Sequence, residues 1–203
     1  SYDLEVVVQN NGSSTITKTE TDIANKIIGR LYNVLAFYEL YREKDVEQEK
    51  DTESSNVLDQ WIIARLNQLI AEVTKGMEAY DMAEATRPFD LFVDDLSTWY
   101  LRRSRDRIKD GDAQAKQTLY FILKTVSKLL APYAPFAAED IWQTLRSESD
   151  SESVHLEMWP EGSKANSDLL NDMQIVRNFC TSGNSLRKKE NIPVRQPLAS
   201  MKI

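Results

Sequence analysis

Apolar residues recur every three or four positions along most of this chain, which is the spacing of helices that bury one face. The pattern occurs in four long runs and two shorter ones, at residues 22–42, 56–79, 81–109, 119–130, 137–146 and 166–186. Long helical runs joined by short polar segments are typical of helix bundles. We therefore expect an all-α protein, an antiparallel bundle of about four long helices with a short helical and strand-like extension at its C-terminal end.

Residues that favour helix ends stand where several of these runs begin. Asn56, with Asp59 three residues later, resembles a capping pair, and Asp112 is placed to cap the helix that follows the turn at Gly111. Gly111 can take the positive φ that such a turn requires. Pro135 suits the first turn of the fifth helix.

Two residues are expected to interrupt helices. Pro88 lies inside the third run, where its missing amide donor predicts a kink or a restart near Arg87. Gly183 lies inside the last run and is expected to interrupt it.

The chain divides into three expected parts. Residues 1–20 are polar with weak alternation and are interpreted as a linker or a remnant of a preceding domain. Residues 21–160 form the helical bundle, and residues 161–203 form a C-terminal helix followed by a strand-like segment that contains two prolines. Connecting segments without a helical period are expected at 42–56, at 147–153, and, as an extended piece, at 155–160.

Composition narrows the class of protein. Only six glycines and six prolines occur in 203 residues, with 28% of residues charged, which favours long helices over many short strands. The single cysteine, Cys180, cannot form an internal disulfide, as suits a reducing compartment. No apolar run approaches the roughly 20 residues of a membrane span. These features predict a cytoplasmic protein without membrane contact.

The stretch DLSTWYLRRSRDRIK, residues 95–109, is basic although the chain is acidic. It has five positive side chains against two negative ones, a net charge of +3, whereas the whole chain has a net charge of -7. Such local charge is expected where a protein meets a phosphate backbone at one place. The stretch could equally be a solvated helix face, with Arg102 paired to Asp106 and with Trp99 and Tyr100 in the core. Spacing alone leaves both interpretations open.

A second basic cluster occupies residues 177–203, with six positive side chains against one negative, a net charge of +5. Without the two clusters, the remainder of the chain has a net charge of -15. RNA could therefore approach only a small part of the surface favourably.

The residue types needed for common active sites are scarce. One histidine, His155, and one cysteine cannot assemble a His/Cys metal cluster, and the chain has no glycine-rich phosphate loop. Adjacent carboxylates such as Asp94 and Asp95 point to different faces of a helix, so they do not form an acid/base pair. We assign no catalytic and no metal-binding residue and do not expect this chain to be an enzyme by itself.

Four strings in order carry a resemblance to a known family. They are DLSTWYLRRSRDR, LLAPYAPFAAEDIWQ, HLEMWPE and LRKKENIPVRQPL. Together they resemble the anticodon-binding region of class I isoleucyl-tRNA synthetases over about residues 21–203. Valyl and leucyl enzymes share forms of the second and third strings, and the WYLRRSR form is more similar to the archaeal and eukaryotic-type branch of the isoleucyl enzyme.

The resemblance implies a tRNA-binding fragment of a larger ligase. The family's HIGH-type and KMSKS-type motifs are absent from this sequence, so the catalytic domain, with its ATP and Mg²⁺, would precede residue 1. No cofactor is implied for this chain. Its implied partners are an isoleucine tRNA and the catalytic domain of the same polypeptide. The alternatives are the equivalent domain of a valyl or leucyl enzyme and a helical module that binds an acidic protein.

Basic residues of the two clusters are the candidates for contact with RNA or with a neighbouring domain. They are Arg102, Arg103, Arg105, Arg107, Lys109, Arg187, Lys188, Lys189 and Arg195. Four aromatic residues are expected to be structural, namely Trp99, Tyr100, Trp142 and Trp159.

Overall fold

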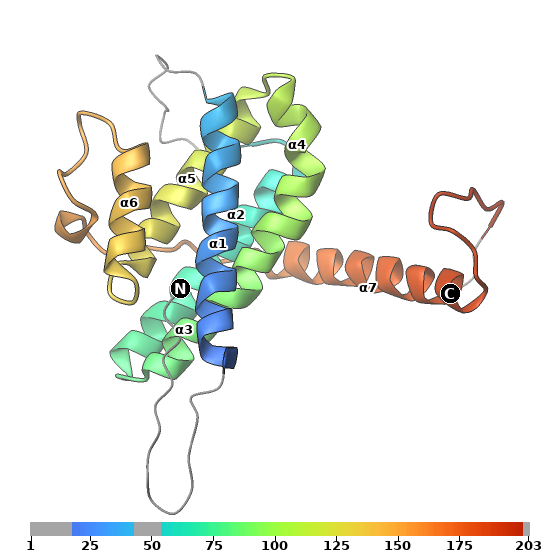
Figure 1. The fold of residues 1–203 in the computed structure, drawn as a ribbon, viewed down its shortest axis with the longest axis horizontal. Coiled ribbons are helices and arrows are strands. Elements are labelled where there is room, and N and C mark those ends of the chain that lie inside the picture. Colours follow the sequence, from blue (N-terminus) through green and yellow to red (C-terminus); the bar gives the residue numbers. More distant parts are fainter. Residues whose placement is uncertain (1–17, 43–53, 201–203) are drawn as a thin grey trace, which may run out of the picture.

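The computed structural model describes residues 18–42 and 54–200, with side chains described from Lys26 onward. Within these ranges the chain is helical and contains no strand, which confirms the all-α expectation (Figure 1). The elements are α1 (Lys18–Tyr41), α2 (Val57–Glu78), α3 (Met82–Asp94), the π-helical segment η1 (Asp95–Leu101), α4 (Arg102–Lys109), α5 (Ala113–Leu130), α6 (Pro135–Leu145), the 3₁₀ turn η2 (Val154–Leu156) and α7 (Ser167–Lys189).

Capping side chains begin four of these helices. The side-chain oxygens of Asn56, Asp81, Asp112 and Asn166 each accept a hydrogen bond from a backbone amide in the first turn of α2, α3, α5 and α7. Gly111 has a φ of 91°, as its turn requires. These positions confirm the predicted starts at Asn56, Asp112 and Asn166, and Pro135 is the first residue of α6 as predicted.

The restart expected near Arg87 is wrong, because α3 is continuous from Met82 to Asp94, while the alternative of a kink there stays a prediction. The reason lies in the packing of α3 on α2 on both sides of the proline. Gly76 of α2 lies so close to Ala85 that a Cβ on Gly76 would be 2.6 Å from the Ala85 amide nitrogen. Phe89 is buried in the core directly after the proline. These contacts favour a continuous helix enough to offset a lost hydrogen bond.

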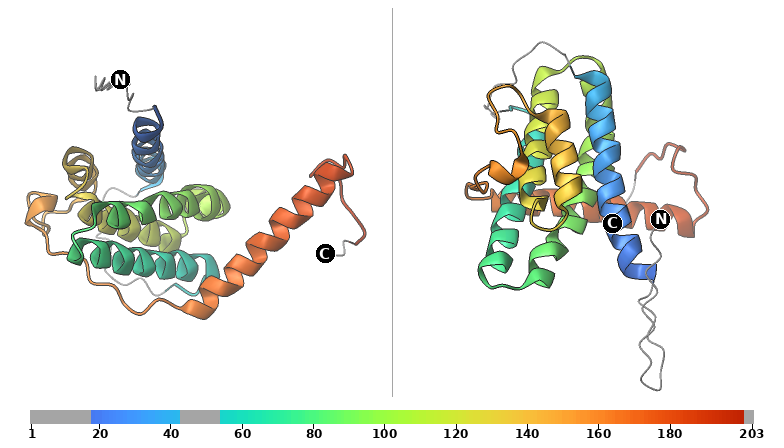
Figure 2. Two further views of the ribbon diagram at one scale, coloured as in Figure 1. Left: turned by 90° about the horizontal axis from the view of Figure 1, so that it is seen from below. Right: turned by 60° about the vertical axis from the view of Figure 1, so that its left-hand side comes forward.

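The bundle has a square arrangement in which α1 and α2 each pack against both α3 and α5. Helices that follow one another in the chain run in opposite directions, so the packed pairs α1 with α3 and α2 with α5 run parallel (Figure 1). Helix α6 covers the outer side of α5 (Figures 1 and 2). Helices α3 and α4 follow one another through η1, and α3 packs on α1 and α2 while α4 packs on α5. The largest fully buried side chains of this core include Trp61, Phe92, Tyr100 and Trp142.

Helix α7 is an arm that projects from the bundle (Figures 1 and 2). Its first half packs against α2, and it runs without interruption through Gly183, so the predicted interruption there is wrong. The strand-like expectation is also wrong for the described residues 190–200, which form turns and bends. Two prolines in that segment lack the amide donors that a strand needs. The segment folds back on α7, where Arg187 Nη1 donates a hydrogen bond to the carbonyl of Pro193 at 3.0 Å.

The expected connecting segments and domain boundaries agree with the structure only in part. The loop predicted at 155–160 starts with the 3₁₀ turn η2, so His155 is not extended. Helix α1 begins at Lys18, four residues before its predicted start, and the rest of the predicted linker at 1–20 lies outside the described residues, as does most of the acidic loop at 42–56. The division into parts at residues 20 and 160 stays a prediction. Among the described helices, none is both long enough and apolar enough to cross a bilayer.

Candidate nucleic-acid interface

Arg107 of the basic stretch is engaged by a buried carboxylate. Asp59 of α2 is fully buried and accepts two hydrogen bonds from Arg107, Nη1 to Oδ1 at 3.1 Å and Nη2 to Oδ2 at 3.0 Å. The hydroxyls of Tyr100 and Ser54 donate to the same carboxylate at 2.9 and 2.7 Å. Asp112 accepts a further hydrogen bond from Arg107 Nε at 2.9 Å. Arg107 therefore joins α4 to the start of α2 and to the cap of α5.

The pKa values of this cluster reflect its geometry. The hydrogen bond to Asp59 raises the pKa of the Arg107 guanidinium above its ordinary value. Burial, reinforced by the negative charge of Asp59, raises the pKa of the Tyr100 hydroxyl. Arg107 and Tyr100 thus keep their protons throughout the physiological range, which suits a structural role for their contacts with Asp59.

Trp99 lies between two arginines from different helices. The Arg103 guanidinium is 3.7 Å from the centre of the indole ring, and the Arg177 guanidinium is 4.9 Å from it. Burial lowers the pKa of Arg103 from its ordinary value. Trp99 is half-buried, whereas its neighbour Tyr100 is fully buried. The stack connects α4 with α7.

The remaining basic residues of the stretch are exposed. Arg102, Arg105 and Lys109 all face solvent, and Arg105 lies 5.3 Å from the ring centre of Phe37. Within the described part of the chain, no hydrogen bond or ion pair joins Arg102 to Asp106, so the pairing considered from spacing is not formed. These three cations are available to a phosphate backbone.

A second group of cations lies at the far end of α7. Lys188, Lys189 and Arg195 are exposed, while Arg187 donates to the carbonyls of Pro193 and Gln196 at 3.0 and 2.8 Å. Basic residues at a helix C-terminus also interact favourably with the helix dipole. Their exposure leaves their charge accessible to an anionic partner.

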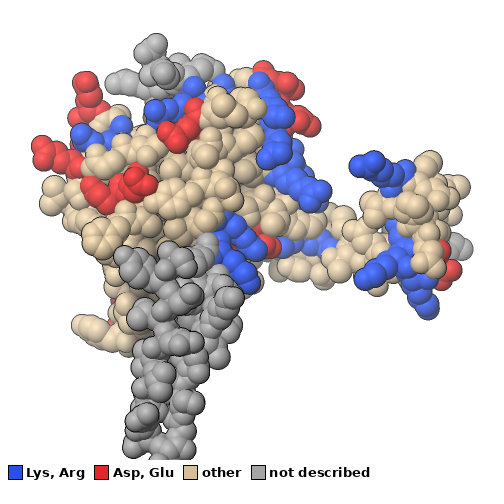
Figure 3. Space-filling model, viewed as in Figure 1, with Lys and Arg blue, Asp and Glu red and all other residues tan. Residues whose placement is uncertain are grey.

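Figure 3 shows how the charges are distributed. Basic side chains follow one edge of the bundle beside α4, and others gather at the far end of α7, with the angle between bundle and arm separating them. Acidic side chains collect over α6 and the loop after it. The two basic groups therefore border one concave angle of the molecule, on the side away from that acidic collection.

Two carboxylates that matter for this geometry were missed in the sequence. The sequence pattern predicts Asp59 only as a capping partner of Asn56 and gives Asp95 no role beyond a negative charge within the basic stretch. In the structure Asp95 is buried and accepts hydrogen bonds from Arg65 of α2 and Arg177 of α7. Both carboxylates bind partners at least 30 residues away, so no local pattern could have identified them.

The other expected structural aromatics lie away from the basic groups. Trp142 is fully buried, donates from its indole nitrogen to the Ser151 carbonyl at 3.1 Å and lies close to the ammonium groups of Lys124 and Lys128. Trp159 is half-buried and donates to the Thr74 hydroxyl at 2.8 Å.

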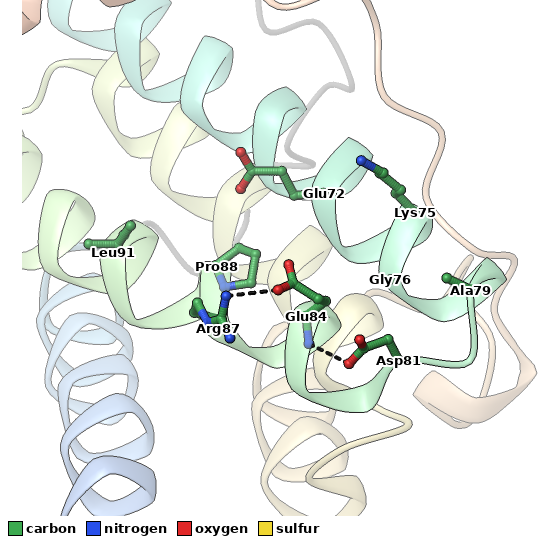
Figure 4. A pocket seen from close by; sticks show the side chains of 9 residues that line it. All are labelled: Glu72, Lys75, Gly76, Ala79, Asp81, Glu84, Arg87, Pro88 and Leu91. Atoms are coloured by element: carbon green, nitrogen blue, oxygen red, sulfur yellow. Dashed lines mark hydrogen bonds and ion pairs between the residues drawn. The ribbon is translucent and has the colours of Figure 1, made fainter.

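A hollow of about 460 Å³ between α2 and α3 contains none of the candidate residues (Figure 4). Three of its charged side chains have local structural partners, since Arg87 pairs with Glu84 at 2.8 Å and Asp81 caps α3. In the described residues, no group of three or more His, Cys, Asp or Glu side chains is placed to hold a metal ion.

Comparison with known families distinguishes a tRNA-binding domain from a helical module that binds an acidic protein. A family model described as the anticodon-binding domain of tRNA ligase matches residues 59–203. The chain belongs to the anticodon-binding domain family of tRNA ligases. The match covers α3, η1 and α4, which carry the basic stretch, and the whole of α7.

Among tRNA ligases, the chain is similar to curated isoleucine–tRNA ligases. The chain is 38% identical to the isoleucine–tRNA ligase of Chlamydia trachomatis serovar D over 98% of its length, and 39% identical to that of Clostridium acetobutylicum over 91%. It is 36% identical to the isoleucine–tRNA ligase of Streptomyces avermitilis over 89% of its length. The chain spans about a fifth of the length of these relatives.

Proposed function

We propose that this anticodon-binding domain holds a tRNA in the angle between the α4 edge of the bundle and the α7 arm. The observation that carries the proposal is the placement of two separate groups of exposed cations on the two sides of that angle (Figure 3). A folded RNA presents phosphates over a wide curved surface, which two separated cationic groups can grip at once. Unpaired anticodon bases could then be read on their edges or stacked on guanidiniums.

The tRNA we propose is an isoleucine tRNA, since the relatives quoted above are named isoleucine–tRNA ligases. The domain would then orient that tRNA for aminoacylation in the cytoplasm by a catalytic domain of the same polypeptide, which would bind ATP and Mg²⁺. The described residues of this chain offer no metal-ligand group of their own. The archaeal and eukaryotic-type branch suggested by WYLRRSR stays a prediction.

We assign the exposed residues Arg102, Arg105 and Lys109 to RNA contact, together with Lys188, Lys189 and Arg195. Arg107 receives a structural role instead, because its guanidinium is occupied by Asp59 and Asp112. We assign Arg103 and Arg187 to neither role alone, since each has a partner within the chain.

The test uses the full 203-residue chain and a fluorescently labelled transcript of an isoleucine tRNA, with a noncognate tRNA for comparison. We expect binding that weakens steeply between two salt concentrations, as ion release from phosphates requires. Charge reversal in the triple variant Arg102→Glu, Arg105→Glu, Lys109→Glu should weaken binding strongly. The matched control Lys75→Glu reverses an exposed lysine of α2 outside both groups and should have little effect. Absence of binding to the isoleucine transcript at low salt would overturn the proposal.

A further inference from the structure

The direction of the α7 arm is set at its first half. Leu169, Leu170 and Met173 pack against the hydrophobic core, whereas Val176 and Phe179 are more than half exposed. In the described part of the chain, Arg177 is the last residue of α7 with an ion pair or hydrogen bond to the bundle. Beyond it the helix projects freely (Figure 2).

Asp95 is the point at which α7 is fastened. Its Oδ1 accepts a hydrogen bond from Arg177 Nη1 at 2.6 Å, and its Oδ2 accepts one from Arg65 Nε at 2.8 Å. One carboxylate thus connects three elements, η1, α2 and α7. The side chain of Asp95 is only 6% exposed, so water screens these ion pairs weakly.

Apolar packing holds only one side of this joint. A hollow of about 390 Å³ lies between α2, η1 and α7, and the ion-paired residues Arg65, Asp95 and Arg177 are part of its wall. A hollow joint resists bending less than a filled core does, because its lining lacks contacts on one side. The angle of the arm therefore depends on the ion pairs and on the contact of Arg177 with Trp99, in addition to the apolar contacts of the first half of α7.

We infer that Asp95, acting through Arg65 and Arg177, is a positioning residue that fixes the angle of the arm and with it the separation of the two cationic groups. The inference rests on the proposed function, because that separation matters only if one RNA touches both groups. Asp95 and Trp99 both belong to η1, and π-helical segments are rare and occur frequently at functional sites. We call the Asp95 carboxylate with its partners Arg65 and Arg177 the clamp. With the clamp intact, the distance between the two cationic groups is set before RNA binds, which reduces the free energy spent on ordering the arm during binding.

The first measurement needs no RNA. In a Cys180→Ser background, Ala71→Cys on α2 and Ser185→Cys on the arm supply two exposed sites for spin labels. Electron paramagnetic resonance should give a narrow distance distribution for the otherwise unchanged chain and a broad or shifted one for Asp95→Asn. Asp94→Asn is the matched control, because Asp94 pairs with Arg30 of α1 and makes no ion pair with α7. Arg177→Met removes the ion pair with Asp95 together with the contact with Trp99, and it should broaden the distribution as well.

The second measurement is affinity for the isoleucine tRNA transcript. If Asp95→Asn leaves the arm correctly placed about one fifth of the time, affinity should fall about fivefold, while Asp94→Asn should bind normally. An unchanged distance distribution in Asp95→Asn and Arg177→Met would overturn the clamp, whatever the RNA result. A broadened distribution with unchanged affinity would overturn the positioning role and leave the proposed function standing. Failure of the unsubstituted chain to bind RNA would overturn the proposed function, and with it the role of Asp95 in positioning an RNA site. The spin-label distances would still show whether Asp95 fixes the angle of the arm.

Discussion

Arg107 and Asp59 face each other across 48 residues of sequence and form two parallel hydrogen bonds of 3.1 and 3.0 Å. The pair connects the end of the basic stretch to the first turn of α2, in a place where Asp59 is shielded from solvent. Bidentate arginine–carboxylate pairs are geometrically specific as well as strong. One member of the basic stretch is thus used to hold the helix that presents the others.

Replacement of Asp59 by asparagine should destabilise the bundle. The change leaves Arg107 without its buried counter-charge and disturbs the hydrogen bonds from Tyr100 and Ser54, and breaking a buried ion pair in this way costs about 3 kcal/mol or more. The free energy of unfolding from urea titration, followed by circular dichroism, measures the loss. Asp106→Asn removes an exposed carboxylate of α4 and serves as the control. Equal stability of the two variants would contradict a structural role for the pair.

Local features of the chain were predictable, and distant ones were not. The helices, including the start of the last one near Asn166, followed from apolar periodicity, and the caps at Asn56 and Asp112 followed from residue types that act within three positions. The roles of Asp59 and Asp95 depend on partners that the fold brings from 30 to 82 residues away. No spacing rule reports such partners.

The departures from prediction at the two proline-containing segments have separate physical causes. Pro88 is accepted in α3 because tertiary packing around Ala85 and Phe89 outweighs a local preference. At the C-terminal end the described residues 190–200 do not form a strand because a strand needs a partner, which α7 does not provide. In the basic stretch, likewise, the sequence gives the charges, but only the structure separates the occupied Arg107 from the exposed Arg105.

Acid should loosen the loop that follows α6. Burial would raise the pKa values of Asp150 and Glu157, but hydrogen bonds and ion pairs with Lys124 and Lys128 outweigh it and hold both pKa values below their ordinary 3.8 and 4.5. Carboxyl groups with depressed folded-state pKa values stabilise the fold above their unfolded pKa values. That contribution is lost as pH falls below about 4.5 and through the lower folded-state values.

The Lys124→Met, Lys128→Met variant tests this dependence. Without the two lysines the carboxyl pKa values should return toward ordinary values, so the free energy of unfolding should change less between pH 5 and about pH 3 than it does in the unsubstituted chain. Urea titrations at a series of pH values give the comparison. An equally steep loss in both proteins would show that other carboxylates cause the acid sensitivity.

Glycine at position 76 should be required for the packing of α3 on α2. An added Cβ would be 2.6 Å from the Ala85 nitrogen, and this contact is with backbone, which cannot rotate away. Gly76→Ala should therefore destabilise the protein by about 1–3 kcal/mol through overpacking. Gly29→Ala is the matched control in α1, where nothing lies within 4 Å of the added Cβ, and it should stabilise the helix by about 0.5–1 kcal/mol. Thermal unfolding of the two variants should shift in opposite directions, and a shift in the same direction would contradict the close approach of the two helices.

The salt dependence of tRNA binding should divide the basic stretch into two classes. Arg105 is exposed, so Arg105→Gln should lower affinity, reduce the slope of log affinity against log salt by about 1 and leave the free energy of unfolding nearly unchanged. Arg107→Gln should do the reverse, because its guanidinium is committed to Asp59 and Asp112. It should lower stability first, and its binding slope, measured at a temperature where the variant is fully folded, should match that of the unsubstituted chain. Titrations at four or five salt concentrations, paired with urea unfolding of the same samples, measure both quantities. If Arg107→Gln reduced the slope as much as Arg105→Gln, Arg107 would contact phosphate despite its ion pairs, and the division of roles proposed for the stretch would be wrong.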